Sequence, residues 1–127
     1  FSDYRNGAEF AAARLVYLGS DIGLIAAVPA PQVYRDRTWH MASAVQNWLS
    51  ENGGLPESIN LISIGTHARR SRMLYQRALG SSVEVGVIVI ETRSFDIDNW
   101  WKTSAGVKTT IMEFIAYLYA RVNFPVA

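Results

Sequence analysis

The stretch that decides the fold runs from a strand into a helix and reads Ile59-Asn60-Leu61-Ile62-Ser63-Ile64-Gly65-Thr66-His67. The apolar, β-branched residues near 60–64 predict a strand, and the glycine that follows lets the backbone turn. Residues 68–79 then predict a helix, and residues 83–90 a second β-branched strand. A strand, a helix and another strand in this order predict parallel strands joined by a helical crossover.

The same alternation extends to both sides of that stretch. We expect helices near residues 9–18 and 38–50, with an apolar run at 23–28, ended by a proline, as a further strand covered on both faces. The last helix, near residues 104–122, has a stripe of apolar side chains that we expect to be buried: Val107, Ile111, Phe114, Ile115, Leu118 and Val122. The sequence therefore predicts one α/β domain over residues 1–127, with a short parallel sheet flanked by helices.

Composition excludes several classes of function. Half of the 127 residues are hydrophobic and 18% are charged, which is typical of a globular domain. The net charge of +1 gives no overall field for nucleic acid, so we expect no nucleic-acid partner. The absence of cysteine excludes disulfides, thiolate catalysis and cysteine-bound zinc. No apolar run reaches the roughly 20 residues of a membrane span, so we expect no membrane segment in this chain.

Candidate binding residues follow the strands, because ligands of open parallel sheets bind beyond the carboxyl ends of the strands. Gly65 lets the backbone approach a ligand, while Arg69 and Arg70 open the next helix, where unpaired N–H groups favour anions. His67 lies just before that helix and is the candidate catalytic acid or base. Ser63 and Thr66 complete this part of the site. The alternative is that the arginines are solvated, or that they only form salt bridges with Asp36, Glu91 or Asp96.

Two other loops are expected at the same edge of the sheet. Arg37 and Thr38 lie at the start of the helix near 38–50. They would line the rim of the pocket, or they are simply solvated side chains of a loop. Trp100 and Trp101 follow the strand near 83–90, where they would form a lid or seat the last helix. No metal is expected, because His67 has no second histidine or carboxylate at a ligand spacing.

The motif from Ile62 to Ser71 resembles the strand-to-helix motif of the ElyC/SanA/YdcF family, a domain of unknown function. His67 and Arg70 match the histidine and arginine of that motif, while Ser63-Ile64 stand where the family usually has Thr-Ser. The resemblance is closest to a subgroup with the sequence HARRSR. That subgroup shares a set of downstream residues: Asp96, Trp100, Trp101, Ser104, Gly106 and Glu113. The resemblance covers about residues 8–124.

This resemblance implies a Rossmann-like three-layer sandwich, a bacterial origin and a link to the cell envelope. Family members begin with a further strand and a glycine-rich turn, and many carry a membrane anchor. Neither is present here, so we expect the chain to be a C-terminal portion of a larger family domain. A three-stranded sheet with an open edge also predicts a homo-oligomer, in which a second copy covers that edge.

Together these observations predict the binding of a small anionic ligand, phosphate-bearing or nucleotide-like, at the carboxyl edge of the sheet. A nucleotide or adenosyl-type cofactor would suit such a pocket. The alternative function is that of a non-catalytic, envelope-associated or oligomerising module. The residues leave open whether the protein is an enzyme, and its localisation rests on the family resemblance alone.

Overall fold

The computed structural model describes residues 4–124, and they form two compact units, one ending at Gly54 and one beginning at Leu55. The first holds α1 (Gly7–Tyr17), the short 3₁₀ helix η1 (Ile22–Leu24) and α2 (Arg37–Glu51). The second holds β1 (Ser58–Ile64), η2 (Gly65–His67), α3 (Ala68–Leu79), β2 (Glu84–Ile90), η3 (Ile97–Lys102) and α4 (Ser104–Asn123). The single domain expected from the sequence stays a prediction.

The two helices of the first unit are confirmed. The helix predicted near 9–18 is α1, and its first turn is capped by Asn6, whose side-chain oxygen accepts the backbone N–H of Glu9 at 3.0 Å. The helix predicted near 38–50 is α2, which follows Asp36 in the left-handed conformation, with a φ of 54°. No helix in residues 4–124 has the combination of length and hydropathy that a membrane span requires.

The strand predicted over residues 23–28 is wrong. Its first residues are instead part of the turn η1, because the carboxylate of Asp21 accepts the backbone N–H of Gly23 at 2.8 Å. None of the residues from 25 to 28 belongs to a strand. Pro29 and Pro31 follow at once and have no N–H to donate to a neighbouring strand. Hydrophobicity alone therefore produced the prediction, and the sheet has two strands in the described residues rather than three.

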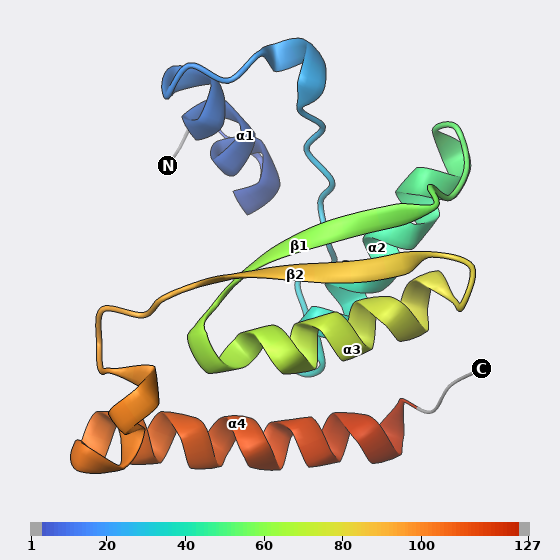
Figure 1. Cartoon of the computed structure of the whole chain (residues 1–127). Helices are drawn as coiled ribbons and strands as arrows, with labels where there is room; N and C mark the ends of the chain where they lie inside the picture. Colours follow the sequence, from blue (N-terminus) through green and yellow to red (C-terminus); the bar gives the residue numbers. More distant parts are fainter. Residues whose placement is uncertain (1–3, 125–127) are drawn as a thin grey trace. The chain divides into compact units, whose positions relative to one another are not determined.

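The second unit confirms the parallel pairing and the helical crossover. β1 and β2 pair in parallel, with Ile62 beside Ile88 and Ile64 beside Ile90. The crossover helix α3 has the predicted bounds, and it ends where Gly80 adopts a φ of 86° that other residues rarely accept. Figure 1 shows the layers of this unit: the sheet, then α3 below it, then α4 on the far side of α3. The protein is thus a mixed α/β chain with a short parallel sheet.

The core of the second unit lies between the sheet and α3. Val83 and Val85 are almost fully enclosed, as is Leu74 on α3. Polar side chains of α3 bind the outer edge of β2 as well. Gln76 donates to the carbonyl oxygen of Val83 at 2.7 Å, and Arg72 donates to that of Val85 at 2.8 Å. These bonds satisfy backbone groups that the edge would otherwise present to another chain.

The opposite face of the sheet is apolar and exposed. Four isoleucines in register occupy it, each at least half exposed: Ile62, Ile64, Ile88 and Ile90. The buried stripe predicted for α4 is also wrong in part. Its apolar side chains Ile111, Phe114, Ile115, Leu118 and Val122 are exposed, whereas Gly106 and Ala120 are buried. Glu113, on the same helix, is largely buried and forms an ion pair with Arg70 of α3.

Candidate functional site: a histidine, an arginine and a glutamate

The turn after β1 depends on Gly65. This residue is buried and has a φ of 55°, a conformation that strains any residue with a Cβ. A Cβ there would meet the side chain of Thr92 at an ordinary contact distance of 3.6 Å, so the backbone angle and not the space requires glycine. The turn carries the chain through η2 into α3, and His67 is the last residue before that helix. It therefore lies at the carboxyl end of β1, as predicted.

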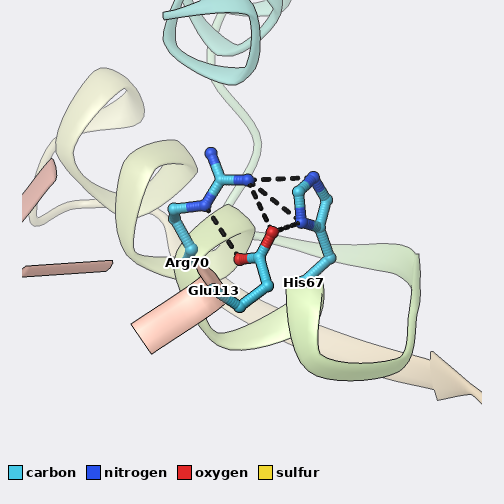
Figure 2. A network of polar contacts seen from close by, with 3 residues as sticks. All are labelled: His67, Arg70 and Glu113. Carbon is cyan, nitrogen blue, oxygen red and sulfur yellow. Dashed lines mark hydrogen bonds and ion pairs between the residues drawn. The ribbon is translucent and has the colours of Figure 1, made fainter. Parts of the chain in front are cut away.

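The side chains of His67, Arg70 and Glu113 contact one another where this turn joins α3. We call these three residues the His67 network (Figure 2). The carboxylate of Glu113, on α4, contacts Nδ1 of His67 through Oε1. Arg70, in the first turn of α3, donates from Nε to Oε2 of Glu113 and from Nη2 to Oε1, both at 3.1 Å. The pairing of Arg70 with Glu113 is therefore bidentate, the geometry that an arginine fork makes best with a carboxylate.

Arg70 also lies against the imidazole ring. Its Nη2 is 3.0 Å from Nδ1 and 3.0 Å from Nε2 of His67. The lone pair or N–H bond of each ring nitrogen points outward in the plane of the imidazole, and these two directions diverge. Because Nη2 is equally close to both nitrogens, it lies along neither direction. The other terminal nitrogen, Nη1, has no hydrogen-bond partner among the described residues. Figure 2 shows Nη1 and the Nε2 of His67 on the side of the network away from the Glu113 carboxylate.

The network is buried on one side and open on the other. The Arg70 and Glu113 side chains are 18% and 17% exposed, whereas the His67 side chain is 47% exposed. The ion pair is thus largely shielded from water, which strengthens its attraction and makes either partner costly to remove. His67 presents the accessible part of the network. This arrangement can orient an imidazole and a guanidinium toward one ligand.

The remaining predicted residues of this segment do not join the network. Arg69 lies over the ring of Tyr117, with its guanidinium carbon 4.4 Å from the ring centroid, so it stacks on α4. Ser63 and Thr66 are half-buried, and their side chains have no hydrogen bond among those described in residues 4–124. The ion pairs of residues 4–124 do not include a salt bridge of Arg69 or Arg70 with Asp36, Glu91 or Asp96. The carboxylate that Arg70 binds is that of Glu113.

Arg37 and Thr38 belong to the first unit. They form the first turn of α2, immediately after Asp36. The His67 network is built from the second unit alone, so a place for these two residues at its rim stays a prediction.

The loop after β2 has a structural role in the described residues. Asp96 caps η3: its carboxylate accepts the backbone N–H of Asp98 at 2.9 Å and the side-chain amide of Asn99 at 2.7 Å. These bonds hold the pKa of Asp96 below its ordinary value. Trp100 and Trp101 meet edge to face, with centroids 6.1 Å apart. Gly106 of α4 lies close beneath the backbone carbonyl of Trp100, so this loop seats the last helix.

Glu113 is the residue of the His67 network that local sequence patterns do not indicate. The sequence points to Glu113 only through the family resemblance. A signal was present, because Glu113 is the sole acidic residue between positions 104 and 123 and lies off the apolar stripe. Its partners, however, lie more than 40 positions earlier in the chain, as the separations of 46 and 43 show. No group of three or more His, Asp or Glu side chains that could hold a metal ion occurs in residues 4–124.

Comparisons with known proteins give no relative: no protein-family model, no curated protein and no solved structure matches this chain. The resemblance to the ElyC/SanA/YdcF family stays a prediction that rests on the motifs quoted above.

Proposed function

We propose that this protein binds a small anionic ligand, phosphate-bearing or nucleotide-like, at the carboxyl edge of its sheet. One observation carries the proposal: Glu113 contacts both His67 and Arg70, while Nη1 of Arg70 has no hydrogen-bond partner in residues 4–124. A guanidinium whose other donors are already fixed loses little further freedom when it binds a ligand. Nη1 is therefore a preorganised cationic donor beside a half-exposed imidazole.

The surroundings of the network favour an anion. α3 begins directly after His67, and the first N–H groups of a helix are unpaired and carry partial positive charge. Arg69 is exposed and its guanidinium rests on the Tyr117 ring, from which its N–H groups remain available. Glu113 opposes this field, but Arg70 neutralises its charge through two hydrogen bonds. If the bound ligand reacts, His67 is the side chain placed to transfer a proton.

The experiment is calorimetric titration of the protein with inorganic phosphate and with a nucleoside monophosphate. Arg70→Lys keeps the positive charge but loses the planar fork, and we expect it to weaken binding at least tenfold. His67→Ala should weaken binding as well. Lys108→Ala removes an exposed positive charge elsewhere on α4 and is the matched control, which should bind like the wild type. Equal weakening by Lys108→Ala and Arg70→Lys would mean that only net charge matters, and the proposed site would be abandoned.

A second candidate function is that of a self-associating module. The observation that favours it is the set of four exposed isoleucines on the free face of the sheet, since exposed apolar patches mark interaction surfaces. We propose that a second copy covers this face rather than the β2 edge, part of which Gln76 and Arg72 already occupy. Light scattering after size-exclusion should give a dimer that Ile62→Asp dissociates. A monomeric wild type would exclude this function.

The family, its Rossmann-like sandwich and its link to the bacterial envelope remain part of the proposal. The β1–α3–β2 crossover supports it, because this parallel unit is the one from which such sandwiches are built. The turn Gly65–His67 supports it too, since His67 and Arg70, which match the histidine and arginine of the family motif, follow the carboxyl end of β1.

A further inference from the structure

We propose that the His67 network selects an oxyanion that carries a proton, hydrogen phosphate, over one that does not, such as sulfate. This inference rests on the proposed function and names the ligand class of the same site. Two groups of the network decide this selectivity. One can still donate a hydrogen bond, and the other can only accept a hydrogen bond.

The proton of the neutral imidazole is assigned to Nδ1 by the partner of that atom. Nδ1 contacts the carboxylate of Glu113, and an ionised carboxylate can only accept a hydrogen bond. In a neutral histidine the other ring nitrogen then carries no hydrogen. Nε2 of His67 therefore offers a lone pair to whatever binds on the open side of the network.

Arg70 does not use up this lone pair. Its Nη2 is 3.0 Å from both ring nitrogens, so it lies along the in-plane lone-pair direction of neither. The open side of the network thus combines one cationic donor, Nη1, with one neutral acceptor, Nε2. A ligand that satisfies both needs a negatively charged oxygen for Arg70 and a hydroxyl for His67.

Hydrogen phosphate meets both needs and sulfate does not. Near neutral pH both are tetrahedral dianions of similar size, and they differ in that one oxygen of hydrogen phosphate bears a hydrogen. Sulfate would place an oxygen lone pair against the lone pair of Nε2 and leave that nitrogen without a donor. Sites built to hydrogen-bond a hydroxyl reject analogues that lack it by large factors.

The test compares the two anions as potassium salts at equal ionic strength and about pH 8. Calorimetry on the wild-type protein should give an affinity for phosphate at least tenfold higher than for sulfate. In Glu113→Gln the side-chain amide can donate to Nδ1, which allows the ring proton to move to Nε2, and the preference should fall below about threefold. Lys108→Ala should keep the wild-type preference.

The outcomes separate this inference from the function on which it rests. Equal affinities for phosphate and sulfate in the wild type would overturn the selectivity and leave an anion site in place. Binding of neither anion would overturn both. Should Glu113→Gln fail to fold, the nitrogen-15 spectrum of the wild-type histidines still decides. We expect a protonated Nδ1 and an unprotonated Nε2 at His67, and the opposite tautomer contradicts the inference.

Discussion

Arg70 on α3 and Glu113 on α4 form a bidentate ion pair, with Nε and Nη2 each 3.1 Å from a carboxylate oxygen. The pair joins the first turn of α3 to the middle of α4, so the two helices are connected where the candidate site begins. Both side chains are more than four-fifths buried. The same contact therefore joins two elements of the second unit and orients the groups of the proposed ligand site.

Glu113→Ala should destabilise the protein by about 2 kcal/mol, because Arg70 is then left largely buried without a carboxylate. Urea denaturation followed by circular dichroism measures the free energy of unfolding. Glu91→Ala is the control, since Glu91 is an exposed carboxylate in a loop, and its effect should stay within about 0.5 kcal/mol. If the two variants lose equal stability, the ion pair does not hold the helices.

Gly106→Ala should be among the most damaging changes in α4. A Cβ at this position would overlap the backbone carbonyl of Trp100 and come within 2.9 Å of the Thr103 hydroxyl. Backbone cannot move aside as a flexible side chain can, so we expect a loss of about 3 kcal/mol in the free energy of unfolding. Gly7→Ala, where a Cβ meets nothing within 4 Å, should be neutral or slightly stabilising. A Gly106→Ala protein as stable as the wild type would show that η3 does not pack on α4 in this way.

Asp96 makes stability depend on pH in the acid range. Its folded pKa lies below the ordinary value of 3.8, because the Asn99 amide and the Asp98 N–H bind the charged form. The unfolded chain therefore binds the proton first, and the contribution of Asp96 is complete above about pH 4 and is lost as pH falls through its folded pKa. Melting temperatures of Asp96→Asn should decline less steeply below pH 4 than those of the wild type. Parallel curves would contradict the assignment.

The two faces of the sheet should respond differently to truncation. Val85 is 0% exposed, and Val85→Ala should cost about 2 kcal/mol for the lost methyl groups and the cavity. Ile62 is 69% exposed on the opposite face, so Ile62→Ala should cost less than about 1 kcal/mol. Equal losses in urea denaturation would indicate that the free face is covered in solution.

The sequence predicted those elements whose signals are local. α3 was predicted with its observed bounds because a helical pattern meets a turn glycine at Gly80, which ends the helix. The parallel pairing followed from the order of strand, helix and strand. The run at 23–28 misled the prediction because hydrophobicity measures burial and does not show whether a neighbouring strand supplies hydrogen bonds.

The candidate site was predicted only in part, because local sequence patterns indicate two of its three residues. His67 and Arg70 are three positions apart and lie at a strand-to-helix turn that local sequence reveals. Glu113 reaches them through the packing of α4 on α3, which no local pattern specifies. The apolar stripe of α4 predicted that another face of that helix is buried, whereas these apolar side chains are exposed and Glu113 forms an ion pair with Arg70 of α3.

The most direct test of the account is a phosphate titration followed through the side-chain signals of the two histidines. His67 lies in the proposed site, and His40, on α2, is the internal reference. We expect phosphate to shift the ring signals of His67 in a saturable manner and to leave those of His40 unchanged, and we expect Arg70→Lys to abolish this effect. If the signals of His67 stay in place as phosphate is added, or if both histidines shift alike, no anion binds at the His67 network.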